Sequence, residues 1–149
     1  MPNSIIPSAA EGLTNESLTS HGSISCGIDM AVLRKMSMKE LHDFREVMHI
    51  VGEILAGFSC QPRFSKGEDR CLNSAGELIE DVVELVSGYA QAAVSVAKAA
   101  TPTGSDAVKW RGWTILGFEA DMADDLAGFA VLATRAVSDE AKAKFREEH

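Results

Sequence analysis

Residues 41–58, with the sequence LHDFREVMHIVGEILAGF, decide the fold of this chain. Their large apolar side chains recur at alternating intervals of three and four residues: Leu41, Phe44, Met48, Val51, Leu55 and Phe58. This spacing aligns them along one side of an α-helix and lets several helices bury a common seam. Ser37 and Glu40, just before it, have the spacing of a capping box. We therefore predict a helix over about residues 38–58, within a helical bundle.

Two longer helices are predicted after this one. The first covers about residues 74–100, and Ser74 and Glu77 give it a second capping-box pattern. Apolar residues line two adjacent sides of that helix, so it should contact two neighbours. The other covers about residues 105–137, because its apolar residues keep the helical period throughout. After Ser138 the chain either extends this helix or forms a short final one.

The remaining segments are shorter or lack a regular apolar period. Asp29 is placed to cap a short helix ahead of the first long one. Residues 59–72 contain a proline, a glycine and a cluster of charges, which predicts a loop. Residues 1–27 are rich in Ser, Thr, Asn and Gly, so they bury too little apolar surface to offset the entropy lost on ordering. We predict a disordered tail over 1–27 and one helical domain over 28–149.

These elements predict an all-α protein, an antiparallel three-helix bundle with short additional helices at its ends. With a rise of about 1.5 Å per residue, the three long helices would span roughly 30, 40 and 50 Å. The ends of the second and third helices would then lack a neighbour within the bundle. We therefore expect a homodimer or another protein partner to cover them.

Composition narrows the range of functions. The 149 residues carry 14 Lys and Arg against 22 Asp and Glu, a net charge of -8 that makes nucleic acid an unfavourable partner. No apolar stretch approaches the roughly 20 residues of a membrane-spanning helix, and the N-terminus lacks a secretion signal. Three cysteines without metal-ligand spacing fit free thiols. We expect a cytoplasmic protein without nucleic-acid or membrane partners.

The first candidate for a metal site is the pair Glu46 and His49. Its Glu-x-x-His spacing is the one that presents ligands inward in carboxylate-bridged di-iron bundles. The apolar stripe of the same helix argues against this reading, because His42, Glu46, His49 and Glu53 all fall on the opposite side. We therefore interpret these four residues as a solvent-facing surface.

The second candidate for a metal site combines acids of the two later helices. Glu77-x-x-Glu80 resembles the first of two carboxylate motifs in the all-α nucleotide pyrophosphohydrolases, which bind Mg²⁺. The second motif of that family, E-x-x-D, is missing, and its nearest counterpart is Asp121-x-x-Asp124. These acids also fit a simpler role, in which they keep the outer face soluble and favour the positive end of a helix.

Trp110 and Trp113 lie off the predicted core stripe of the third helix. Large aromatic side chains in such positions are enriched at protein interfaces. Beside that stripe, Ala123, Ala127 and Ala130 are small enough to let another backbone approach closely. We predict that these five residues form an interface, unless the helix begins after Trp113 or a loop covers both rings.

No stretch carries a nucleophile, phosphate-binding or cofactor motif, so we assign no catalytic residue and no cofactor. The preferred hypothesis is a non-enzymatic, acidic helical-bundle protein that acts by protein–protein interaction or self-assembly. One alternative is a metal-dependent hydrolase or oxidase that uses the acidic helices. Another is an acidic decoy that binds a nucleic-acid-binding protein.

Overall fold

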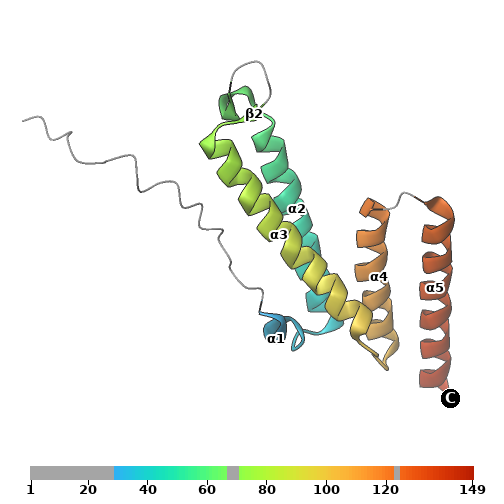
Figure 1. The fold of residues 1–149 in the computed structure, drawn as a ribbon. Coiled ribbons are helices and arrows are strands. Elements are labelled where there is room, and N and C mark those ends of the chain that lie inside the picture. The colour runs from blue at the N-terminus through green and yellow to red at the C-terminus, as the bar shows by residue number, and fades with distance from the viewer. Residues whose placement is uncertain (1–28, 67–70, 123–124) are drawn as a thin grey trace, which may run out of the picture.

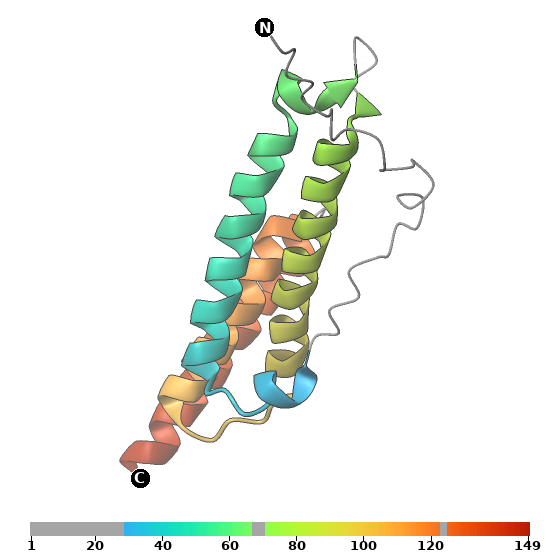
Figure 2. The same cartoon turned by 90° about the vertical axis from the view of Figure 1, so that its left-hand side faces the viewer.

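The fold is an all-α antiparallel bundle, as predicted (Figure 1). The structure, a computed structural model, describes residues 29–66, 71–122 and 125–149, so the predicted tail over 1–27 lies outside the described residues. The described part contains five α-helices: α1 (Met30–Leu33), α2 (Met38–Ser59), α3 (Ser74–Ala99), α4 (Ser105–Met122) and α5 (Leu126–Glu148). Figure 2 shows α2 and α3 side by side, with α4 and α5 behind them as a second layer.

The start of α2 confirms the predicted capping box. The Ser37 hydroxyl accepts a hydrogen bond from the Glu40 amide at 3.2 Å, and the Glu40 carboxylate accepts one from the Ser37 amide at 2.7 Å. Asp29 likewise caps α1, where its carboxylate accepts from the Ala31 amide at 2.9 Å. These local hydrogen bonds satisfy amide groups that a helix start leaves without partners.

The start of α3 matches the predicted range, but its capping residue is not the predicted one. The cap is Asn73, whose side-chain oxygen accepts from the amides of Ala75 at 3.1 Å and Gly76 at 3.0 Å. The predicted capping box of Ser74 and Glu77 is therefore wrong, because Ser74 is already the first helical residue. The side-chain nitrogen of Asn73, Nδ2, also donates to the Arg63 carbonyl oxygen at 2.8 Å, which fixes this side chain as the cap.

The connection between α2 and α3 is more regular than the predicted loop. It contains a 3₁₀ helix, η1 (Pro62–Phe64), and a short antiparallel hairpin of β1 (Ser65–Lys66) and β2 (Cys71–Leu72). The connection packs tightly on the start of α3. A Cβ atom at Gly76 would lie only 2.8 Å from the Phe64 carbonyl oxygen, so glycine is required there.

The predicted single helix over 105–137 is wrong, because the chain breaks between α4 and α5. Asp125 has an extended backbone, with φ of -132° and ψ of 106°. Its carboxylate accepts from the Ala127 amide at 2.9 Å and the Gly128 amide at 3.0 Å, which starts a new helix. That helix continues past Ser138 to Glu148 and folds back along α4 (Figure 1). The predicted 50 Å helix, and the overhang that led us to expect a partner, are therefore absent.

The core is centred on α3, the helix predicted to have two neighbours. Its buried residues gather in its C-terminal half, and α1, α2 and α4 all pack against it. The buried apolar side chains of α3 are Val86, Ala90, Ala92, Ala93, Val94, Val96 and Ala97. By contrast, α5 packs extensively only against α4 within the described part of the chain. Close approach of these two helices is possible because Gly112 faces Ala136.

Candidate functional site

The buried side of α2 is rotated away from the side that the apolar stripe indicated. Leu41, Arg45, Gly52 and Ser59 are the buried residues of this helix. A row of apolar side chains is instead exposed by 42–55%: Val47, Ile50, Ile54 and Phe58. The helix contacts α3 on one side and α4 on another, so its buried side lies between these two neighbours. The side with His42, Glu46, His49 and Glu53, predicted to face solvent, is partly covered: Glu53 is exposed, whereas the other three are half-buried.

A buried arginine organises the contact between α2 and α4. The Arg45 side chain is only 3% exposed, and its Nη2 donates to the Asp121 carboxylate at 2.7 Å. Arg45 also forms an ion pair with the neighbouring Glu46 carboxylate. His49 Nε2 lies 3.7 Å from the same Asp121 oxygen. Glu46, His49 and Asp121, three of the six metal-ligand candidates, thus meet around a guanidinium group.

Gly117 makes room for this guanidinium group. A Cβ atom at Gly117 would lie 2.8 Å from Arg45 Nη1 and 3.1 Å from Arg45 Cζ. Arg45 Nε has no hydrogen-bond partner among the residues described, although it is buried. The arrangement is suited to holding α2 and α4 in register, because hydrogen bonds between charged groups are directional and stronger than those between neutral groups.

The Arg45 cluster supplies its own positive charge at the place where a metal ion would bind. In the ranges that the structure describes, no three His, Cys, Asp or Glu side chains are grouped so that they could hold a metal ion. A cavity of about 260 Å³ adjoins the cluster between α2, α3 and α4. Its walls are mainly apolar, with Ser87, Gln91 and Glu53 as further polar residues. This geometry offers a packed, charged helix contact rather than an assembled catalytic group.

The other metal-ligand candidates lie apart from this cluster. Glu77 is in the first turn of α3, where its carboxylate pairs with Lys66 Nζ at 3.0 Å, beside the β1–β2 hairpin. Glu80 follows one turn later and is half-buried. Asp124 lies outside the described residues. The two halves of the proposed acidic site, Glu77 with Glu80 and Asp121 with Asp124, are therefore not brought together by the residues that can be placed.

The two tryptophans occupy different environments. Trp110 is half-buried in the α2–α4 contact, where its ring centroid is 5.1 Å from that of His42. Lys39 Nζ and Lys109 Nζ lie 5.4 and 5.1 Å from the centre of the Trp110 ring. Trp113 is 55% exposed. Only Trp113 therefore presents most of its ring to solvent.

An apolar surface extends from Trp113 along α5. Trp113 and Val137 line the same shallow cavity of about 130 Å³ between α4 and α5. At 100° per residue, Leu126, Ala127 and Ala130 lie on the flank of α5 that carries Val137. We define the α4–α5 outer surface by these five residues, all exposed: Trp113, Leu126, Ala127, Ala130 and Val137. It contains three of the five predicted interface residues, while Trp110 lies in the α2–α4 contact and Ala123 lies outside the described residues.

The residue that the sequence reasoning missed is Arg45. It directly follows Phe44 of the apolar stripe but does not belong to the three- and four-residue spacing of that stripe. A useful signal was present on α4, where Gly117 and Asp121 are four residues apart and therefore share one side of the helix. On a helix that packs against another, a small residue leaves room for a side chain of the neighbouring helix, and an acid next to it favours a basic one.

No family model, curated protein or solved structure matches this chain. Within the described ranges, every helix is too short or too polar to cross a membrane.

Proposed function

We propose that this protein is non-enzymatic and acts by self-association, with two copies meeting through the α4–α5 outer surface. The observation that carries this proposal is the exposure of α5, which among the described residues packs extensively only on α4. Leu126 is 85% exposed and Val137 is 68% exposed, while Trp113 on α4 is 55% exposed. Large apolar groups that cluster on the surface of a soluble protein mark an interaction site.

The composition of α5 supports a second copy of this chain as the partner. Residues 126–134, LAGFAVLAT, contain no charged side chain. Two molecules with a net charge of -8 repel each other, so they approach at least cost where the surface is uncharged. Ala127 and Ala130 also let a second helix approach closely, and two hairpins packed by a two-fold axis form a four-helix arrangement. Trp113 then provides the kind of large aromatic anchor that dominates binding energy at interfaces.

A cytoplasmic location fits this proposal. Cys60 and Cys71 are exposed free thiols that flank the η1–β1 segment. Exposed thiols persist in a reducing compartment, whereas an oxidising one favours disulfides.

Sedimentation velocity on the full chain at micromolar concentration tests the proposal. We expect a dimer whose proportion rises with protein concentration. Val137→Glu places a charge beside Trp113 on the α4–α5 outer surface and should shift the protein to a monomer. Ile50→Glu is the matched control, since Ile50 is 53% exposed but lies on α2. It should leave the dimer intact.

Two results would overturn this proposal. One is a wild-type monomer across the accessible concentration range. The other is a dimer that Ile50→Glu dissociates and Val137→Glu does not, which would move the interface to the exposed row on α2. Circular dichroism of each variant confirms that helicity is retained, because both positions are already exposed in the folded chain.

The two tryptophans give a further prediction for the same interface. Trp113→Ala should weaken the dimer by about tenfold or more while leaving monomer stability nearly unchanged, because the ring is mainly exposed. Trp110→Ala should instead lower the free energy of unfolding, because its ring packs against His42. Dimer dissociation constants and urea unfolding curves of both variants provide the two measurements. If Trp110→Ala weakens the dimer more than Trp113→Ala at equal stability, the outer surface is wrongly placed.

A further inference from the structure

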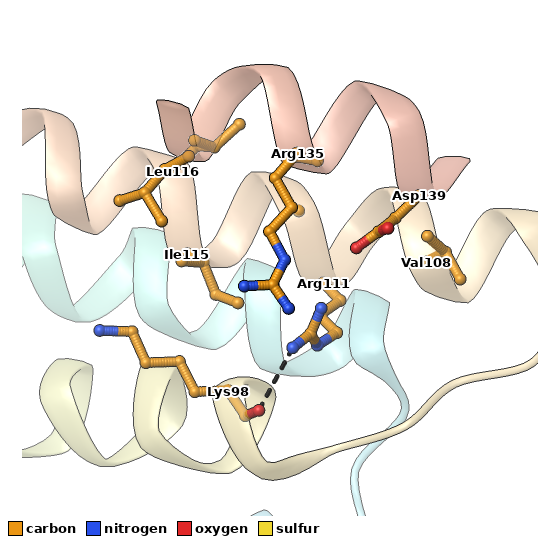
Figure 3. A pocket seen from close by; sticks show the side chains of 10 residues that line it. Lys98, Val108, Arg111, Ile115, Leu116, Arg135 and Asp139 are labelled. Carbon is orange, nitrogen blue, oxygen red and sulfur yellow. Dashed lines mark hydrogen bonds between the residues drawn. The ribbon is translucent and has the colours of Figure 1, made fainter. Parts of the chain in front are cut away.

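A second cavity lies between the C-terminal end of α3 and the α4–α5 pair. Its volume is about 320 Å³, and it opens to solvent (Figure 3). Apolar side chains from α4 and α5, among them Ile115, Leu116 and Leu132, form much of its wall. A cavity of this size falls at the lower end of the range for small-molecule sites, which begins at about 300 Å³.

Three basic side chains meet at this cavity, although the chain as a whole is acidic. Lys98, Arg111 and Arg135 line it, and Asp139 is the one acid in its lining. Figure 3 shows Arg111 of α4 and Arg135 of α5 extending toward the same part of the cavity. Two guanidinium groups in one cavity repel each other unless an anion lies between them. In a protein of net charge -8, this local excess of positive charge favours the binding of an anion.

The protein itself uses only part of this positive charge. Arg111 is held at the end of α3, where it donates to the carbonyl oxygens of Ala97 at 2.9 Å and Lys98 at 3.2 Å. Lys98 Nζ donates to the Glu119 carboxylate at 2.6 Å. Arg135 has neither a hydrogen bond nor an ion pair with any residue that can be placed, and Asp139 is not paired with it. The Arg135 guanidinium is therefore available to an incoming anion, with Arg111 already oriented beside it.

The chemistry of the walls selects the class of ligand. A guanidinium group binds a carboxylate through two parallel hydrogen bonds. The apolar walls favour a ligand whose carboxylate is attached to an apolar body. A single negative charge suits the site better than a doubly charged phosphate, because Asp139 lines the cavity and the surrounding protein is acidic.

We propose that the cavity between α3, α4 and α5 binds a small amphipathic carboxylate, with Arg135 and Arg111 holding the carboxylate and Ile115 and Leu132 contacting its apolar part. The site is independent of self-association. Arg135 and Asp139 line this cavity, whereas Trp113 and Val137 line the separate shallow cavity of the α4–α5 outer surface. A monomeric protein would therefore still bind this ligand.

Titration of the full-length, ¹⁵N-labelled protein with octanoate, followed by NMR, tests the site. We expect saturable shifts in the amide signals around Ile115, Leu132 and Arg135, and weaker binding as salt concentration rises. Octanol carries the same apolar chain without the charge, and acetate carries the charge without the chain. Both should bind at least about tenfold more weakly than octanoate, since octanol cannot form the ion pair with the arginines and acetate cannot contact the apolar walls.

Arg135→Met removes the charge and keeps most of the aliphatic side chain. It should weaken octanoate binding by about tenfold or more. Arg146→Met is the matched control, because Arg146 is an exposed arginine on the same helix that does not line the cavity. It should bind octanoate like the wild type, and thermal unfolding should show that both variants are folded. The proposal is overturned if octanoate causes no saturable shifts, if octanol binds as tightly, or if the two variants bind equally well.

Discussion

The α2–α3 pair and the α4–α5 pair are both antiparallel helical hairpins, but they differ in how much of each helix is covered. In α3, eight residues are buried, and seven of them lie between Val86 and Ala97. In α4 only Thr114 is buried, and in α5 only Ala143. Since the helices are of similar length, the difference comes from the number of neighbours. Three helices pack on α3, whereas α5 is extensively covered only by α4 within the described chain.

The two hairpins differ in where their small and apolar side chains lie: those of α3 form the core, whereas several of those on α5 remain on the surface. The buried half of α3 is rich in alanine, and small side chains allow α1, α2 and α4 to approach it together. On α5, alanines of the same kind remain exposed, together with Leu126 and Val137. Alanines that allow close helix packing are therefore covered by neighbouring helices at α3, whereas at α5 they remain exposed. That difference is the physical basis for both binding proposals.

The largest difference in the free energy of unfolding is expected between two leucine-to-alanine substitutions, one in each hairpin. Leu41 on α2 is fully buried, so Leu41→Ala should lower the free energy of unfolding by about 2–5 kcal/mol. Leu126 on α5 is 85% exposed, so Leu126→Ala should change it by no more than about 0.5 kcal/mol. Urea unfolding of the monomer followed by circular dichroism measures both values. Similar losses for the two variants would show that α5 is as well packed as α2, and the comparison would fail.

A smaller change in the free energy of unfolding is expected for a substitution at the contact between the two hairpins. In Gly117→Ala the new methyl group would lie 2.8 Å from Arg45 Nη1, so the buried guanidinium must shift away from Asp121. We expect a loss of about 1–3 kcal/mol in the free energy of unfolding.

Gly57→Ala is the matched control for Gly117→Ala, since no atom of the described residues lies within 4 Å of a Cβ atom built there. It should stabilise the protein by about 0.5–1 kcal/mol, because alanine favours the helix. If both alanine variants are stabilised, the Arg45 cluster is not a tight contact between α2 and α4.

Local signals in the sequence predicted most of the fold. The capping box at Ser37 and Glu40 placed the start of α2 correctly, and the predicted end near Phe58 is one residue short of the observed one. The period of apolar residues could not reveal the break between α4 and α5. Met122, Leu126 and Phe129 keep helical spacing across it, while a single acid, Asp125, caps the new helix. The break is marked by one capping residue, whereas the apolar period extends over many residues on both sides, so the period alone predicts a continuous helix.

The candidate sites were harder to predict because they depend on how helices are rotated against one another. Arg45 and Asp121 are 76 residues apart, and nothing in either helix specifies their pairing. The observed buried side of α2 includes Arg45 and Gly52, which lie to one side of the predicted apolar stripe. Trp113 and Val137 belong to one surface only because the chain turns between α4 and α5. Spacing within a helix fixes which residues share a side, but not which neighbour that side meets.

The smallest effect concerns the contact that fastens the end of α5 to the start of α4. The Glu147 carboxylate accepts from the Ser105 hydroxyl at 2.5 Å and from the Ser105 amide at 2.6 Å. These two hydrogen bonds lower the pKa of Glu147 below its ordinary value. A carboxylate with a lowered pKa stabilises the folded state fully above its unfolded pKa, and loses this contribution as the pH falls through the folded pKa.

Hydrogen exchange at the Ser105 amide reports directly on this contact. In the wild type, protection of that amide should decline as the pH is lowered into the acidic range where Glu147 takes up a proton, once intrinsic exchange rates are corrected for pH. Glu147→Ala should remove the protection at neutral pH, with little change in the free energy of unfolding, because the group is fully exposed. Glu148→Ala changes the neighbouring acid and should leave the Ser105 amide protected. Equal protection in the two variants would mean that the Glu147 carboxylate does not hold the Ser105 amide, and that the end of α5 is kept on α4 by its apolar contacts.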